Sequence, residues 1–192
     1  MKLAREPSAP VDAALFKQAM RHLAGAVSVV TVGRGDDRTG FTATSVSSFS
    51  ADPPSILVSL NRSSSSWEAL QRNRHFCVNI LAHDQHHVAD RFAGAQGAKG
   101  ISRYEGASWQ PLVTGALSLS EALTVIDCEL DESIDRHSHS ILIGRVCAVT
   151  SRHNAQPLLY WHGAYRRLDA NEPNRGLIAV EAAEPRLLSK VG

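Results

Sequence analysis

The apolar residues of this chain fall into short runs that are soon interrupted by glycine, proline, serine or aspartate. Alternating or β-branched apolar runs are typical of strands, and such runs cover residues 27–32, 40–54, 55–60, 75–81, 123–130, 140–150 and 157–168. Short helices are expected over residues 12–24, 67–74 and 84–92. Repeated βαβ units require longer helices, so the pattern favours a mostly β fold with short helices (α+β), built as an antiparallel barrel.

The length of the chain allows one domain with short extensions. A chain of 192 residues is long enough for one sizeable hydrophobic core. We expect a flexible N-terminal arm over residues 1–11 and the folded domain over residues 12–168. The patterning fades over residues 169–192, which are expected to form a C-terminal tail.

Charge and hydropathy argue against several classes of protein. The formal net charge is +1, which does not favour nucleic acid binding through bulk electrostatics. No apolar run approaches the roughly 20 residues that span a bilayer, and residues 1–10 lack the apolar segment of a secretory signal. Cys77, Cys128 and Cys147 are scattered without metal-ligand spacing, which is typical of reduced thiols. We therefore expect a cytoplasmic protein without membrane or nucleic acid partners.

The segment 40–54 carries more hydroxyl groups than a packed strand needs. Small hydroxylated residues alternate with apolar ones until the segment ends at Asp52, Pro53 and Pro54. Converging hydroxyls and free backbone amides suit a ligand that carries phosphate or a polar heterocycle. A polar edge strand that enters a proline turn would have the same composition, and the segment alone does not distinguish the two interpretations.

A second polar cluster follows the strand predicted at residues 55–60. Asn61 and Arg62 precede the serines of residues 63–66, after which a helix is expected. Serine before a helix is first of all a capping residue, but this run exceeds what capping requires. A helix N-terminus also binds anions, and Arg62 would add a positive charge. The cluster therefore predicts an anion site.

The glycine-rich segment 33–40 follows a strand, as a dinucleotide-binding loop does. However, Arg38 occupies the position of the third glycine, and no helix follows the segment. Asp36 and Asp37 would also repel a pyrophosphate. The segment is therefore predicted to be a hairpin loop.

Three histidines have a spacing that raises the question of a metal site. His83, His86 and His87 would share one face of a helix. No glutamate of an HExxH motif accompanies them, and no distant ligand is evident. We expect a solvated helix face and no metal.

Several separated motifs, in the same order, resemble the flavin reductase-like family. They occupy residues 40–48, 52–54, 59–64, 76–81 and 90–94. The likeness extends over about residues 16–168 and is greatest to the small reductase components of two-component flavin-dependent monooxygenases. The resemblance implies an FMN-binding split β-barrel, usually a homodimer with the flavin near the subunit interface.

The resemblance also implies an NAD(P)H:flavin oxidoreductase. Such enzymes oxidise NADH or NADPH, reduce FMN or FAD, and pass the reduced flavin to a partner monooxygenase component. NADH is the expected donor here, and the residues do not choose between FMN and FAD. A non-catalytic flavin-binding or redox-sensing protein on the same barrel is the alternative function.

Candidate site residues follow from the positions that match the family motifs. Those expected along the flavin ring and ribityl chain are Thr42, Ala43, Thr44, Ser45, Val46 and Ser47. Those expected near the phosphate are Asn61, Arg62, Ser63 and Ser65, while Arg91, Phe92 and Tyr165 are expected to border the site. His139 matches the family histidine that lies by the nicotinamide. The residues before His139 depart from the family pattern, so His137 remains an alternative.

Overall fold

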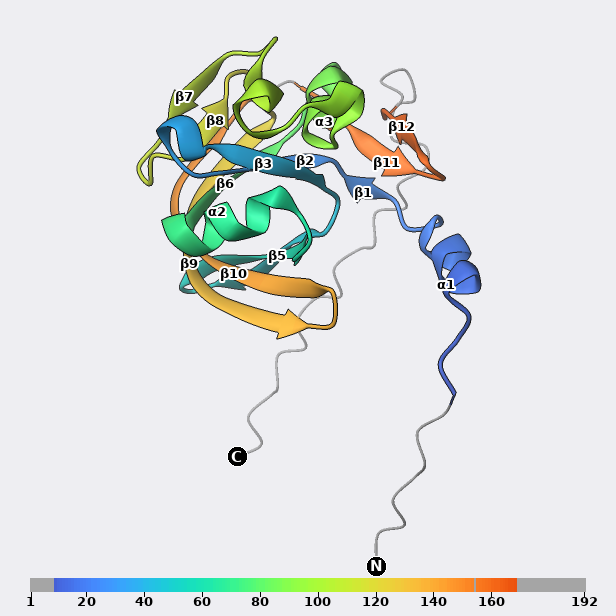
Figure 1. The fold of residues 1–192 in the computed structure, drawn as a ribbon. Coiled ribbons are helices and arrows are strands. Elements are labelled where there is room, and N and C mark those ends of the chain that lie inside the picture. The colour runs from blue at the N-terminus through green and yellow to red at the C-terminus, as the bar shows by residue number, and fades with distance from the viewer. Residues whose placement is uncertain (1–8, 154, 169–192) are drawn as a thin grey trace, which may run out of the picture.

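The computed structural model describes residues 9–153 and 155–168. The predicted tail at residues 169–192 and residues 1–8 of the predicted arm lie outside this description. A seven-stranded sheet forms the centre of the fold, with the strand order β3-β2-β6-β9-β10-β5-β4 (Figure 1). Every neighbouring pair in the sheet is antiparallel. This confirms the prediction made from the lack of helices long enough for repeated βαβ units. The strands are β2 Ser28–Val32, β3 Thr39–Ala43, β4 Val46–Ala51, β5 Pro54–Asn61, β6 His75–Ile80, β9 Thr124–Arg136 and β10 His139–Ser151.

The hydroxyl-rich segment contributes two strands instead of one. β3 and β4 are the two edge strands of the sheet, yet only Thr44 and Ser45 separate them along the chain. The sheet must therefore curl until its two edges approach each other. Side chains from β3, β5, β6, β9 and β10 fill the interior together with helix α2 Ser65–Asn73. Since β3 and β4 do not pair, the barrel is split between them.

Local capping explains where two of the helices begin. The Asp12 carboxylate accepts hydrogen bonds from the backbone amides of Ala14 and Leu15, which starts α1 Ala13–Met20 as predicted. Helix α2 begins two residues before the predicted position, because Ser64 caps it by accepting a hydrogen bond from the amide of Ser66. The third helix, α3 His86–Phe92, begins two residues later than predicted and ends at the predicted residue.

A second core lies on the other face of β2, whose five residues are all buried. Helix α3 and a segment of short elements cover this face. Between them lie the aromatic side chains of Phe92, Tyr104 and Trp109, whose ring centroids are 4.9–5.4 Å apart. The short elements are η2 Ala95–Gly97, η3 Gly100–Tyr104, β7 Trp109–Pro111 and β8 Leu117–Leu119. The predicted hairpin loop at residues 33–40 is confirmed, and it contains the single turn η1 Gly35–Asp37 between β2 and β3.

The last predicted strand, residues 157–168, is a hairpin. It consists of β11 Leu159–Trp161 and β12 Ala164–Arg166, and β11 also pairs with β1 Gly25–Ala26. His162 and Gly163 form the turn, and both have positive φ angles, of 53° and 80°. A continuous strand cannot pass through that backbone conformation. Figure 1 shows this small sheet at the end of β2, between α3 and α1.

Among residues 9–153 and 155–168, no helix combines the length and the apolar character that crossing a bilayer requires.

His75, the first residue of β6, is buried, and this burial predicts a pH dependence of stability. Its Nε2 atom has no hydrogen-bond partner in the described part of the chain, and burial lowers the pKa of the imidazole below its ordinary value. The unfolded chain therefore takes up this proton more readily than the folded chain. The stability contributed by neutral His75 is complete above a pH of about 6.5 and is lost as the pH falls below that value.

Denaturant unfolding at a pH of about 7.5 and about 5.5 measures this effect. The unfolding free energy of a His75→Gln variant should fall less between these pH values than that of the parent chain. An equal fall in both proteins would assign the pH dependence to other groups.

Candidate functional site

A cleft of about 390 Å³ opens at the β3 edge of the curled sheet, where the chain crosses from β3 toward β4. It lies at the end of β3, the end of β5 and the start of β10, which bring together segments far apart in the sequence. A volume of this size falls within the range of small-molecule sites. The residues that line it are Phe41, Thr42, Ala43, Thr44, Ser45, Ser59, Leu60, Asn61, Ser64 and His139.

The strand that forms one wall of the cleft is anchored at Gly40. The Gly40 carbonyl accepts hydrogen bonds from the Ser66 hydroxyl at 2.9 Å and from the Arg103 guanidinium. A Cβ atom at Gly40 would lie 2.5 Å from the Val30 carbonyl oxygen and 2.6 Å from the Phe92 ring. Glycine is therefore required where β3 crosses this ring.

Two further hydrogen bonds position β3 against neighbouring elements. The Thr42 hydroxyl donates to the Ala89 carbonyl of α3 at 2.6 Å, and the Tyr104 hydroxyl donates to the Thr39 carbonyl at 2.6 Å. These contacts come from α3 and η3 on the side away from the barrel interior. They make β3 a rigid wall, which is a requirement for precise ligand placement.

The polar cluster after β5 forms a tight turn at the second wall. The Asn61 side-chain oxygen accepts hydrogen bonds from the amide of Ser63 at 3.0 Å and from its hydroxyl at 2.9 Å. Ser64 then caps α2. Because Ser64 also lines the cleft, the N-terminus of this helix lies beside the cleft. Free amides at such a terminus suit an anionic group. Ser65 lies in the first turn of α2 and is exposed, but it does not line the cleft.

The structure separates the two candidate histidines. His139 lines the cleft, pairs with Asn61 in the β5–β10 register, and its Nδ1 atom lies 2.8 Å from the Ser138 hydroxyl. His137 occupies the tip of the β9–β10 hairpin with a positive φ of 51°. Its carbonyl faces Arg62, and its side chain lines none of the described cavities. The geometry therefore favours His139 over His137.

Arg62 is turned away from the cleft. Its Nη1 atom lies 3.2 Å from the Asp135 carboxylate, and its Nη2 atom donates to the His137 carbonyl. The sequence motif placed this guanidinium near a phosphate, but its present partners belong to the hairpin that carries His139.

The remaining predicted site residues lie outside the cleft wall. Val46 lines a neighbouring cavity, and the Ser47 hydroxyl on edge strand β4 donates to the Ser48 carbonyl. Arg91 pairs with Glu105 at 2.9 Å, and Phe92 is buried because the apolar face of α3 packs against the core.

Tyr165 also lies outside the cleft and contacts α3. Its hydroxyl donates to an Asp90 carboxylate oxygen at 3.0 Å. Burial, helped by this hydrogen bond and by the negative charge of Asp90, raises the pKa of Tyr165 to about 12, so the hydroxyl stays protonated.

Four cleft residues were not predicted, namely Phe41, Ser59, Leu60 and Ser64. Ser59 and Asn61 point to the same face of β5 because side chains alternate along a strand. This alternation along β5 could have identified Ser59 as a cleft residue from the sequence. Leu60 is almost fully buried, and no pattern in its own segment indicates that it borders a ligand cleft.

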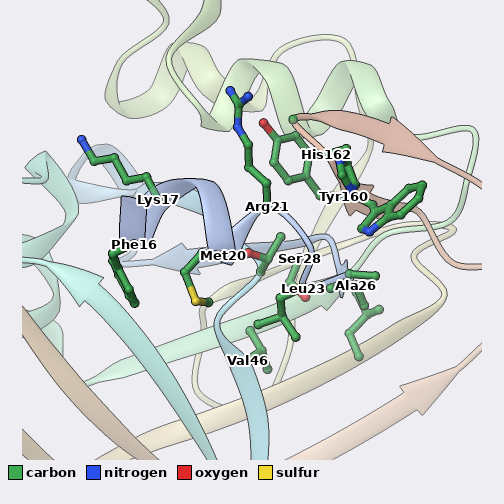
Figure 2. A pocket seen from close by; sticks show the side chains of 16 residues that line it. Phe16, Lys17, Met20, Arg21, Leu23, Ala26, Ser28, Val46, Tyr160 and His162 are labelled. Atoms are coloured by element: carbon green, nitrogen blue, oxygen red, sulfur yellow. The ribbon is translucent and has the colours of Figure 1, made fainter. Parts of the chain in front are cut away.

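A larger cavity of about 650 Å³ adjoins the cleft and shares Thr44 with it. Figure 2 shows Phe16, Met20 and Arg21 of the N-terminal region on one side of this cavity, with Tyr160 and His162 from the small sheet nearby. None of the α1 side chains is buried, and several of them are large and apolar. This wall of the cavity is therefore an uncovered apolar surface.

The histidines considered as metal ligands do not share a helix face. His83 precedes α3, whereas His86 and His87 begin it, and their two rings meet edge to face at 6.1 Å. In the described part of the chain, no three His, Cys, Asp or Glu side chains are grouped as metal ligands.

The chemistry of the cleft suits a polar, anionic heterocycle. Within residues 9–153 and 155–168, its lining offers hydroxyls, an amide and one imidazole, but no carboxylate. Backbone groups and hydroxyls can hold a flavin ring, while the α2 terminus can accept a phosphate. The residues present therefore fit a flavin nucleotide.

Comparison with known proteins also indicates a protein that acts on flavin. The flavin reductase like domain matches residues 20–169, which is most of the chain. The chain belongs to the flavin reductase-like family.

Relatives within that family cover most of the chain. FMN reductase (NADH) RutF of Methylorubrum extorquens is 40% identical over 162 residues, which are 83% of this chain and 78% of that protein. The structure of BorF, the flavin reductase component of a bacterial two-component tryptophan halogenase, has a TM-score of 0.76 and 32% identity, covering 82% of this chain and 98% of BorF. Flavin reductase PheA2 has a TM-score of 0.73 and 28% identity, with 83% and 99% covered.

Proposed function

We propose that this protein is an NADH-dependent flavin reductase that supplies reduced flavin to a partner monooxygenase. The observation that carries the proposal is the cleft, which joins the hydroxyl-rich strand, the Asn61 turn and His139 in a member of the flavin reductase-like family. The RutF relative is named for FMN and NADH, which supports these two substrates here. FAD is the other flavin that the cleft chemistry allows. BorF is the flavin reductase component of a two-component tryptophan halogenase, which supports a partner enzyme that receives reduced flavin from this chain.

The bound flavin would supply the redox chemistry, because its ring accepts a hydride from the nicotinamide. The protein residues bind and orient the two nucleotides. Residues 42–45 on the cleft wall would lie along the ring and ribityl chain, with Val46 and Ser47 beyond the edge of the cleft. Asn61 would border the phosphate at the start of α2, with Ser63 and Ser65 next to it outside the cleft lining. His139 would contact the nicotinamide, while Phe92 would support β3 from the side away from the barrel interior. By holding the two rings in a reactive arrangement, these residues would supply most of the catalysis.

The decisive assay is oxidation of NADH and NADPH with and without added FMN or FAD. Flavin-dependent oxidation that is faster with NADH is expected. Absence of turnover with every combination would reject the enzymatic function. Flavin that copurifies tightly without any nicotinamide oxidation would instead support a non-catalytic flavin-binding or redox-sensing protein.

We also propose that the protein is a homodimer whose second copy covers α1. Leu15 and Leu23 are 60% and 67% exposed, and Phe16 and Trp161 are also exposed at the larger cavity. Apolar side chains gathered in this way are typical of a protein interface. Because that cavity shares Thr44 with the cleft, the second copy would border the flavin.

Sedimentation equilibrium should therefore give twice the mass of the chain. The double variant Leu15→Glu/Leu23→Glu is expected to sediment as a monomer, because burial of two carboxylates at an interface is unfavourable. Val113→Glu, which changes an exposed apolar residue on the β7–β8 turn, is the matched control and should remain a dimer. A monomeric parent protein would contradict the proposal.

We further propose a cytoplasmic location. Cys77, Cys128 and Cys147 are all unpaired thiols in the structure, which suits a reducing compartment that also supplies NADH.

A further inference from the structure

The Asp135 carboxylate holds Arg62 away from the site where a flavin phosphate would bind. Both terminal nitrogens of the guanidinium are engaged, Nη1 by an Asp135 oxygen at 3.2 Å and Nη2 by the His137 carbonyl. The Arg62 side chain consequently does not line the cleft, although Asn61 and Ser64 on either side do. Arg62 thus lies next to the cleft while its charge is directed elsewhere.

Asp135 is itself fixed from the interior. Its other oxygen accepts a hydrogen bond from the Ser140 hydroxyl at 2.6 Å, and Ser140 is fully buried. An exposed carboxylate without such an anchor would sample many rotamers and would hold an arginine weakly. Here each oxygen has a separate partner, one on β10 and one on the turn after β5.

The backbone of the same region is equally well defined. The Arg62 amide donates to the Ser138 carbonyl at 2.9 Å, and His139 pairs with Asn61. A change in the Arg62 side chain would therefore leave its Cα beside the cleft. Only the side chain must turn for the guanidinium to reach a ligand there.

We propose that Asp135 competes with the flavin phosphate for Arg62 and thereby sets the affinity for phosphate-bearing flavins. This inference rests on the proposed function. Carboxylate and phosphate bind a guanidinium through the same paired donors, so one must displace the other. The Asp135 charge also repels an approaching phosphate. Riboflavin, which has no phosphate, does not take part in this competition.

The competition has a functional consequence for a reductase. Part of the phosphate's binding energy is spent in separating Arg62 from Asp135, so flavin is held less tightly than an unpaired arginine would hold it. A reductase that passes its product flavin to another protein requires such release. Asp135 is therefore a specificity-determining and positioning residue of the flavin site.

Binding of FMN and of riboflavin, measured by flavin fluorescence, tests the proposal. Asp135→Asn retains an acceptor for Ser140 but removes the charge, so FMN should bind about two- to five-fold more tightly, as expected for an exposed ion pair, while riboflavin binding stays unchanged. Ser140→Ala should change FMN binding in the same direction, because it releases the Asp135 anchor. In an Arg62→Ala background, Asp135→Asn should lose most of its effect on FMN.

Glu132→Gln is the matched control. Glu132 lies on the same strand, is exposed, and pairs by backbone with Ile143 away from Arg62, so its removal changes net charge without freeing the guanidinium. FMN affinity that is unchanged or weaker in Asp135→Asn would overturn the competition. An equal change for FMN and riboflavin would also overturn it, as would an equal gain in Glu132→Gln.

The measurement separates this inference from the proposed function. A parent protein that binds neither flavin contradicts both. A parent protein that binds FMN and oxidises NADH with it, together with an unaltered FMN-to-riboflavin ratio in Asp135→Asn, contradicts only the role of Asp135.

Discussion

Replacement of His139 by alanine is expected to lower the rate of nicotinamide oxidation about 10²-fold, the lower end of the effect of a positioned acid–base group. Among the described residues, His139 is the only ionisable side chain that lines the cleft, together with the hydroxyl-rich end of β3. Its imidazole can hydrogen-bond the nicotinamide carboxamide or assist a proton transfer. Loss of either contact should reduce kcat/KM for NADH, while FMN binding by fluorescence should change little.

His137→Ala is the matched control, because it removes an imidazole two residues away that faces no described cavity. Single-turnover oxidation of NADH with saturating FMN would measure the hydride step directly for both variants. His137→Ala is expected to retain nearly the full rate. The opposite order of the two variants would reassign the nicotinamide contact to His137.

Gly40→Ala should lower the free energy of unfolding by about 3 kcal/mol, the upper end of the usual cost of overpacking. The added methyl group would lie 2.5 Å from the Val30 carbonyl and 2.6 Å from the Phe92 ring. The carbonyl belongs to the paired strand β2 and cannot move without breaking the β2–β3 register. For a protein of this size, a loss of 3 kcal/mol corresponds to a fall in Tm of roughly 6–12 °C.

Thermal and denaturant unfolding would measure this effect, with Gly97→Ala as the control. A Cβ atom at Gly97 meets nothing within 4 Å, so only its positive φ of 74° adds strain, at a cost of about 1 kcal/mol. A Gly40→Ala protein as stable as the parent would show that β3 can shift. In that case the β3 wall of the cleft would be less rigid than its anchoring contacts indicate.

The local features of the fold were largely predictable. Apolar periodicity placed most strands of the main sheet to within two residues, and capping placed the start of α1 at Asp12. It joined β3 to β4, and it ended β9 at residue 130 although the strand continues to Arg136, because the apolar pattern stops where the strand becomes exposed and charged. The hydroxyl-rich segment and the Asn61 turn were identified as ligand-binding candidates from side-chain chemistry. These features depend on neighbours close in the chain, which local sequence encodes.

Other parts of the candidate site depended on contacts between distant segments. The break between β3 and β4 at Thr44 arises because the curled sheet sends the two halves of one segment to opposite edges. Phe92 matches a family motif, yet it packs in the core because α3 presents its apolar face to β2 and β3. Arg62 has Asp135 as its partner, 73 residues further along the chain.

The sequence by itself therefore determined most of the strands, the short helices, the family resemblance and the chemical character of the segments that line the cleft. Only the tertiary structure decided that His139 and not His137 faces the cleft, and that Arg62 is held by Asp135. The physical reason is that strand register and sheet curvature bring residues from β3, β5 and β10 together. Both depend on pairing across the whole sheet, and a pattern within one segment cannot specify them.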